Sequence, residues 1–224
     1  MASAPAGRGG RQAPRLGTDP TPSVTSGPAS GSVVDRLVAA ATRLFANQGY
    51  ERTTVQEVVV AAGVTKGAMY HYFASKDDLL HEIYHRILTM QLERLGAFAD
   101  DAGAIDARLR EAAIDVLATT VDNFDDLTVV ARCMHLLAPP QQRAVRAERR
   151  RYHETFRDMI VEGQRAGVFA SDVDADLVVD FFFGAVHHLP MWFRPDGRLS
   201  GQALGEAYAD LLLRALAPLD RPAR

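Results

Sequence analysis

A short stretch around residue 70 gathers side chains that can bind nucleic acid. Thr65 and Lys66 are followed by the small Gly67, and Tyr70 and His71 come one turn later. Hydroxyl and ammonium groups bind phosphates and base edges, and ring side chains add further hydrogen bonds at the same surface. The small residue lets the start of a helix enter the major groove of DNA. This combination points to contact with DNA.

Two short helices are expected to position these side chains. Valines recur at helical spacing in residues 54–62, which predicts an amphipathic helix. Thr54, or the threonine before it, stands where an N-cap hydroxyl belongs. Gly63 supplies the positive φ that ends a helix and allows a sharp turn. Thr65 then caps a second helix over residues 66–73. Two helices across such a turn form the DNA-binding helix-turn-helix unit.

A third helix is predicted from Ser75 to about Ala99, directly after this unit. Asp77 and Asp78 lie in its first turn, where the helix dipole favours acidic residues. Lys76, at its start, is placed to reach a phosphate. A preceding helix over residues 32–48 is expected to pack behind the two DNA-binding helices.

The run TTVQEVVVAAGVTKGAMYHYFASKDDLL, residues 53–80, resembles the N-terminal domain of the TetR family of transcriptional regulators. The Ala-Gly-Val-Thr turn, the Tyr-His-Tyr-Phe helix end and the following Ser-Lys-Asp-Asp-Leu match that family's pattern nearly position by position. The resemblance covers residues 33–84. Val59 departs from the pattern, because the family usually has a small Ala there. The resemblance implies an operator in double-stranded DNA as the partner.

The resemblance also implies a phosphate contact by the threonine at the start of the second helix, through its hydroxyl or its backbone N–H. Lys66 reaches either a guanine edge or a phosphate, and Tyr72 either packs inward or reaches a phosphate. The expected DNA-binding residues are Thr53, Thr54, Thr65, Lys66, Gly67, Tyr70, His71, Tyr72 and Lys76.

Composition excludes several other classes of protein. Of 224 residues, 47% are hydrophobic, yet no run is long enough for a membrane span and no signal peptide is visible. The single cysteine, Cys133, excludes a disulfide framework and suits the cytoplasm. No Gly-rich phosphate loop or nucleophile motif indicates an enzyme, and no cofactor is expected. His81 and His85 have metal-binding spacing, but without a third ligand nearby we interpret them as a solvated or partly packed pair.

Charge is distributed unevenly along the chain. Residues 1–76 carry 8 basic and 4 acidic side chains, whereas the remainder carries 17 basic and 24 acidic ones. A basic amino end on an acidic body fits a protein that places one end on DNA. We expect an all-α chain of about nine helices, in four parts: a disordered basic arm over 1–31, which either adds DNA affinity or has no role; a helix-turn-helix domain over 32–78; a helical ligand-binding and dimerisation domain over 79–217; and a disordered tail over 218–224.

The helical body is predicted to contain five helices after the connecting one. They cover residues 105–124, 127–138, 141–166, 172–193 and 200–216. Pro139 and Pro140 are expected to stop the second of these, and Pro190 to kink the fourth. The fourth is apolar nearly all round, so a second copy of the chain is its simplest cover. The expected dimerisation residues are Leu177, Phe181, Gly184, Ala185, Leu204, Tyr208, Leu211 and Leu212.

The carboxyl third of the chain has its own resemblance. Trp-Phe-Arg-Pro-x-Gly-Arg-Leu-Ser at residues 192–200, behind Gly-x-x-x-Gly-Val-Phe at 163–169, resembles a TetR subgroup that controls fatty-acid and sterol degradation. Its members commonly sense acyl-coenzyme A (acyl-CoA) thioesters. The arginines at 143–151 are then either a solvated helix face or a grip for ligand phosphates. The candidate pocket residues, each of which is equally explained as plain core, are Leu117, Val121, Phe124, Met134, Tyr152, Phe156, Phe182, His187 and Trp192.

These patterns predict a homodimeric, ligand-responsive repressor that binds a near-palindromic operator and is released by a small hydrophobic effector. The effector is either an acyl-CoA thioester or a drug-like molecule, as in regulators of efflux or secondary metabolism. Activation in place of repression stays open, and an architectural DNA binder without a ligand is the remaining alternative.

Overall fold

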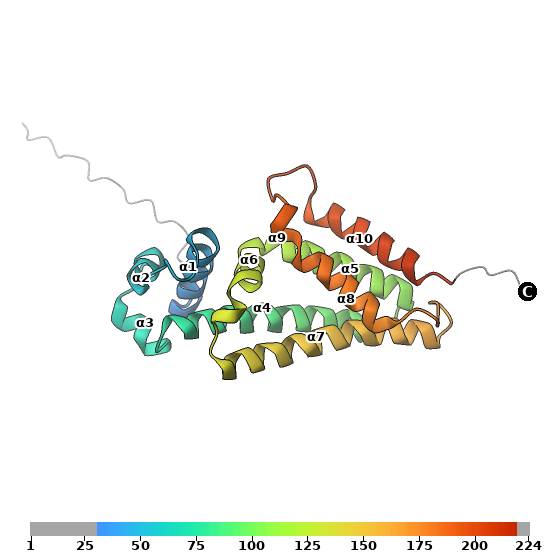
Figure 1. The fold of residues 1–224 in the computed structure, drawn as a ribbon, viewed down its shortest axis with the longest axis horizontal. Coiled ribbons are helices and arrows are strands. Elements are labelled where there is room, and N and C mark those ends of the chain that lie inside the picture. The colour runs from blue at the N-terminus through green and yellow to red at the C-terminus, as the bar shows by residue number, and fades with distance from the viewer. Residues whose placement is uncertain (1–30, 219–224) are drawn as a thin grey trace, which may run out of the picture. The chain divides into compact units, whose positions relative to one another are not determined.

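The computed structural model describes residues 31–218, and these fold as helices without a strand (Figure 1). The predicted basic arm falls outside the described residues apart from Gly31, as does the predicted tail apart from Pro218. No described helix is long and apolar enough to cross a membrane. The elements are α1 (Val33–Gln48), α2 (Val55–Ala62), α3 (Lys66–Tyr72), α4 (Lys76–Ala99), α5 (Ile105–Asp122), α6 (Phe124–Cys133), a 3-10 turn (Met134–Leu136), α7 (Pro139–Arg165), α8 (Ala175–His187), the single turn α9 (Leu189–Trp192) and α10 (Gly201–Leu216).

Local capping chemistry sets the ends of the first four helices. The side chains of Ser32, Thr54 and Ser75 each accept a hydrogen bond from the backbone N–H three residues on, and the acidic side chain at that position accepts one from the backbone N–H of the cap residue. Gly63 ends α2 in the left-handed conformation at φ 62°, as its position in the sequence predicts. The turn between α2 and α3 is therefore encoded by a handful of adjacent residues.

The predicted bounds of three helices in the body are wrong. The helix predicted over residues 127–138 is α6, which begins at Phe124 and ends at Cys133, before a 3-10 turn. Pro139 does not stop a helix but begins α7, because proline at the first helical position loses no intrahelical hydrogen bond. The predicted helix over residues 172–193 is not one kinked helix: α8 ends at His187 and α9 begins at Leu189. Pro190 explains the break, because it has no N–H to offer the carbonyl four residues earlier.

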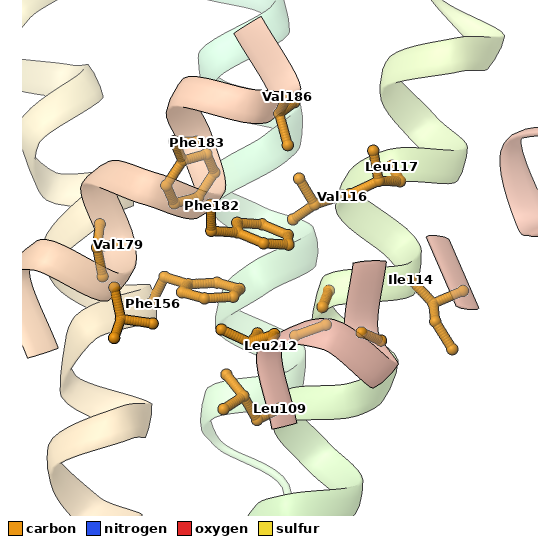
Figure 2. Packing of buried hydrophobic residues seen from close by; sticks show 14 of the residues in the cluster. Leu109, Ile114, Val116, Leu117, Phe156, Val179, Phe182, Phe183, Val186 and Leu212 are labelled. Atoms are coloured by element: carbon orange, nitrogen blue, oxygen red, sulfur yellow. The ribbon is translucent and has the colours of Figure 1, made fainter. Parts of the chain in front are cut away.

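The body core lies among α5, α7, α8 and α10. Figure 2 shows apolar side chains of these helices pointing toward one another, with Leu109 from α5, Phe156 from α7, Phe182 from α8 and Leu212 from α10. The rings of Phe156 and Phe182 stack, with centroids 4.9 Å apart and an interplanar angle of 13°. This core is closely packed, and all four side chains are buried.

Small residues let neighbouring elements approach closely. A Cβ on Gly205 of α10 would lie 2.8 Å from the carbonyl oxygen of Ile114 in α5, so only glycine fits there. A Cβ on Gly163 would collide with the Phe169 ring, at 2.1 Å from its nearest atom. The first glycine of the Gly-x-x-x-Gly-Val-Phe run thus makes room for the phenylalanine that ends it.

The helix α4 joins the two parts of the chain. Its first half packs with α1 and belongs to the same apolar cluster as α2 and α3, and its second half runs beside α7 (Figure 1). The apolar cluster around α1–α4 also takes in Val129, Cys133, Leu137 and Val145 from the body. The amino-terminal helices therefore share one core with α6 and the start of α7.

Candidate functional site

The outer face of α3 presents the predicted DNA-binding side chains to solvent. Thr65, Lys66, Gly67 and His71 are exposed. Tyr70 and Tyr72 are 49% and 51% exposed, so Tyr72 does not pack inward. Met69, on the opposite side of the helix, is fully buried. The Thr65 hydroxyl caps α3 by accepting from the N–H of Ala68 at 3.1 Å.

Thr53 corrects one of the predicted DNA contacts. It is only 1% exposed, and its hydroxyl donates to the Gly49 carbonyl at 2.8 Å. Its backbone N–H donates to the Tyr50 carbonyl. Both donors of Thr53 are therefore used inside the protein, whereas Thr54 is exposed at the start of α2.

Lys76 joins the start of α4 to the loop before α2. Its ammonium group donates to the carbonyls of Tyr50 at 2.8 Å and Thr53 at 3.0 Å. It also lies 4.1 Å from the centroid of the Tyr50 ring. The Tyr50 hydroxyl donates to Asp77, the residue after this lysine. Two of the three N–H groups of Lys76 thus hold the loop, which leaves one for an outside partner.

Polar contacts join the amino-terminal helices to the body. The Tyr84 hydroxyl in α4 donates to the Val130 carbonyl in α6 at 2.8 Å. Thr42 in α1 donates to Asp126 in α6 at 3.4 Å. Burial raises the pKa of Asp126 to about 6, well above the ordinary range of an aspartate. The helix α6 therefore contacts both α1 and α4.

A cavity of about 60 Å³ lies in the body between α4, α5, α6, α7 and α8. From α4, four residues contribute to its wall, between Tyr84 and Gln91. The complete lining is Tyr84, Ile87, Leu88, Gln91, Val116, Thr120, Asn123, Leu127, Val130, Met134, Val145, Arg149, Tyr152, His153, Phe183, Val186 and His187.

Three of the predicted pocket residues, Met134, Tyr152 and His187, line this cavity. The others do not, which corrects the prediction. Leu117, Phe156 and Phe182 are packed in the body core. Val121 and Phe124 line a separate open groove beside α1, and Trp192 is exposed on α9. Hydrophobic periodicity cannot distinguish core residues from cavity-lining residues, because both recur on the inward face of a helix at the same spacing.

Sequence reasoning missed several polar residues in the cavity wall: Gln91, Thr120, Asn123 and His153. Thr120 stands four residues after Val116 on the buried face of α5, where an apolar residue would be expected. His153 follows Arg149 by four residues, so both lie on one face of α7. A polar residue interrupting an apolar stripe was the available signal.

Arg149, His153 and His187 form the polar end of the cavity. The guanidinium of Arg149 donates to Nδ1 of His187 at 3.1 Å. The His153 ring stacks on Phe183, with centroids 4.3 Å apart. Burial, followed by the charge of Arg149, lowers the pKa of His153 to about 4 and that of His187 to about 3. Both imidazoles are therefore neutral at neutral pH.

An open groove on the outer side of α7 and α8 adjoins this polar end. Arg149 and His153 line both the groove and the cavity. Arg146 and Arg150 line the groove as well, whereas Arg143 and Arg151 of the same cluster do not. The groove also contains Arg157, Glu154, Asp176, Val179 and Asp180. Because Arg157 pairs with acidic neighbours, the other three arginines carry the positive charge available to an anion.

The helices α8 and α10 leave an apolar groove between them at the surface. Leu177, Phe181 and Leu211 are 67%, 75% and 60% exposed. Gly184 is exposed, and a Cβ built there would meet nothing within 4 Å. Ala185 and Tyr208 line the same groove. Two predicted dimerisation residues differ: Leu204 is buried in the core of its own chain, and Leu212 is buried at the floor of the groove.

Comparison with known families agrees with this architecture at both ends. Residues 37–83 match the family described as bacterial regulatory proteins, tetR family. Residues 102–216 match the family described as tetracyclin repressor-like, C-terminal domain. The second match covers α5 to α10.

Individual proteins are similar along most of the chain. The HTH-type transcriptional repressor KstR2 of Mycolicibacterium smegmatis is 29% identical over 207 residues, which is 86% of this chain and 93% of that protein. The structure of the TetR family regulator PfmR from Thermus thermophilus is 30% identical, with a TM-score of 0.75 over 84% of this chain and 100% of PfmR. AibR, solved with isovaleryl coenzyme A and operator DNA, is 23% identical with a TM-score of 0.70, over 84% of this chain and 99% of AibR.

Proposed function

Because the chain belongs to the TetR family of bacterial transcriptional regulators, we propose that it is a cytoplasmic repressor released from its operator by an acyl-CoA thioester. The observation that carries this proposal is the course of α4. This 24-residue helix starts beside the α2–α3 unit and lines the cavity from Tyr84 to Gln91. One rigid element therefore joins the proposed DNA face to the proposed effector site.

The proposed DNA face is the exposed side of α3, together with Thr54, the N-cap residue of α2. Thr65, Lys66, Tyr70 and His71 are free to reach base edges, and Tyr72 is free to reach a phosphate. Thr54 and the remaining N–H of Lys76 complete the phosphate contacts, while Gly67 allows close approach of the helix. Direct hydrogen bonds to bases then determine the operator sequence.

The cavity and the groove together suggest the effector class. The cavity wall is mostly apolar, the groove is lined by arginines, and the two share Arg149 and His153. An acyl chain fits the apolar cavity wall, whereas the phosphates of coenzyme A fit Arg146, Arg149 and Arg150 in the groove. Arg149 and His153, which line both, would lie beside the thioester. AibR, which shares the fold, was solved with a thioester of this kind.

The size of the cavity suggests how binding is coupled to DNA release. Pockets for drug-sized ligands measure about 300–1,000 Å³, so a cavity of about 60 Å³ must expand several-fold to hold an acyl group. Expansion would move one or more of the five helices that form its wall, and we propose that α4 and α6 are among them. The Tyr84–Val130 and Thr42–Asp126 hydrogen bonds pass that movement to the amino-terminal helices. An effector that prefers the expanded state by about 2 kcal/mol weakens DNA binding about 30-fold.

The exposed apolar face of α8 and α10 is the proposed dimer interface. Leu177, Phe181 and Leu211 would be covered by the same residues of a second copy, and Gly184 would allow close helix approach. A dimer places two α3 helices on half-sites about 34 Å apart. It thereby accounts for a near-palindromic operator.

The test begins with selection of bound sequences from a random DNA library by the full-length protein. We expect an enriched near-palindrome whose half-sites are about one helical turn apart. Fluorescence anisotropy on that DNA is then followed while octanoyl-CoA, octanoate or coenzyme A is added. Release by octanoyl-CoA alone is the expected result. Failure to enrich any sequence would contradict the DNA-binding proposal, and release by octanoate alone would contradict the thioester proposal.

A further inference from the structure

Two buried polar atoms in the cavity wall have no hydrogen-bond partner within the described part of the chain. They are Oγ1 of Thr120 in α5 and Nε2 of His153 in α7. Thr120 is only 3% exposed, so solvent outside the cavity does not reach it. Both residues line the cavity, but only His153 also lines the arginine groove.

An unpaired hydroxyl in this position weakens the folded protein, because a buried polar group that has lost its water partners is costly. Valine has almost the shape of threonine and would fill the same position without that cost. The other threonine buried nearby shows the usual solution: Thr128 in α6 donates to the Phe124 carbonyl at 2.9 Å. The hydroxyl of Thr120 is therefore explained best by a partner that arrives with the ligand.

We propose that the effector is an acyl thioester whose acyl group carries a further oxygen, as a hydroxyl or keto group, and that Thr120 recognises this oxygen. The proposal rests on the proposed thioester effector. His153, where the cavity meets the arginine groove, hydrogen-bonds the thioester carbonyl. Thr120 lies away from the groove, so it meets an oxygen further along the acyl chain.

This arrangement selects against unsubstituted acyl chains. A saturated chain that fills the cavity leaves the Thr120 hydroxyl sealed without a partner, whereas an oxygenated chain of the same length satisfies it. Sites built around a hydrogen bond discriminate strongly against analogues that lack the bonding group. We expect about tenfold discrimination in the dissociation constant from this one contact.

Calorimetric titration of the full chain with octanoyl-CoA and with hydroxyoctanoyl-CoA isomers, hydroxylated at successive carbons, tests the proposal. At least one isomer should bind the natural sequence about tenfold more tightly than octanoyl-CoA. Thr120→Val should abolish this preference, because it removes the hydroxyl that distinguishes the isomers from octanoyl-CoA. Thr128→Val is the matched control: this threonine is 8% exposed, does not line the cavity and should retain the preference.

Two further measurements separate the possible failures. His153→Phe keeps an aromatic ring against Phe183 and should weaken all thioesters by a similar factor. Without ligand, Thr120→Val should raise the melting temperature, whereas Thr128→Val should lower it. Equal binding of octanoyl-CoA and every isomer, or an unchanged preference in Thr120→Val, would overturn the role of Thr120. Absence of binding by every thioester would instead contradict the proposed effector class.

Discussion

Arg149 donates a hydrogen bond to Nδ1 of His187 at 3.1 Å, from α7 to the last residue of α8. A guanidinium has no acceptor, so Nδ1 of His187 must carry a lone pair and the neutral ring carries its proton on Nε2. The arginine thus fixes both the charge and the tautomer of a histidine in the cavity wall. It also connects the helix that lines the groove to the end of α8.

Replacing Arg149 should change the titration of His187. Burial is the larger cause of its low pKa and the nearby positive charge the second. In Arg149→Met the pKa of His187 should therefore rise from about 3 but stay below its ordinary value of 6.5. Nitrogen-15 NMR of the imidazole checks this, together with the expected loss of the single tautomer. Arg143→Met, outside the groove, should leave His187 unchanged.

The neutral histidines should make the protein less stable in mild acid. The pKa of His153 is about 4 in the folded chain, against an ordinary value of 6.5. The unfolded chain therefore binds more protons in this interval, and the unfolding free energy should fall as pH drops from about 6.5 to 4. Denaturant titrations at several pH values measure the slope. His153→Phe should make it shallower, and an unchanged slope in that variant would argue against a neutral His153.

Asp126 should have the opposite effect. Its pKa of about 6 in the folded protein lies above the ordinary 3.8, so the folded protein binds this proton more tightly than the unfolded chain does. The stability that Asp126 contributes is therefore fully present below pH 3.8 and is lost as the pH rises through 6. At pH 8, Asp126→Asn should raise the unfolding free energy by about 1–3 kcal/mol, and at pH 4 it should have little effect. Asp122→Asn is the control, because Asp122 is exposed and lines, with Asp126, the open groove beside α1. It should change the unfolding free energy by less than about 0.5 kcal/mol at both pH values.

Two lysines should separate a structural role from a DNA contact. Lys76→Met removes two hydrogen bonds to the loop carbonyls and should lower the unfolding free energy by about 1–3 kcal/mol. Lys66→Met changes an exposed side chain and should weaken DNA binding without a comparable loss of stability. Thermal unfolding and anisotropy on the selected DNA measure the two effects. Equal destabilisation by both substitutions would contradict this division.

The apolar face of α8 and α10 predicts the oligomeric state. Phe181→Asp should convert a dimer to a monomer in sedimentation velocity, because it places a charge on the apolar face of the proposed interface. Met191→Asp is the control, since Met191 is equally exposed at 75% but lies on α9. A Phe181→Asp protein that remains dimeric would place the interface elsewhere.

The helix-turn-helix could be predicted closely from the sequence because its information is local. The N-cap residues Thr54, Thr65 and Ser75 and the positive φ of Gly63 act within one turn of the chain. The direction of the Thr53 hydroxyl could not be predicted, because it depends on how the loop folds back on Gly49. Adjacent threonines look alike in sequence, and here they differ in the local conformation of the loop, which turns Thr53 back toward Gly49 and Tyr50.

The cavity was less predictable for a related reason. Of the aromatic residues expected in its wall, Tyr152 lines the cavity, whereas Phe156 and Phe182 fill the core. The residues that distinguish the cavity are polar ones set in apolar stripes, such as Thr120 and His153, and only the packing of five helices brings them together. Proline was ambiguous as well: Pro139 begins a helix, while Pro190 marks the break between two.

Val129, Cys133, Leu137 and Val145 of the body complete the apolar cluster of α1–α4. This limits how freely such a regulator can be recombined. Transferring the DNA-binding end alone onto another sensor would leave part of that cluster open to water, and the hybrid would be prone to aggregation. A chimera with a junction in α4 should fold only if the recipient supplies matching apolar residues from its own α6 and α7. Exchange of DNA specificity is thus constrained by a shared core, even though the proposed DNA face and the proposed effector site are separate.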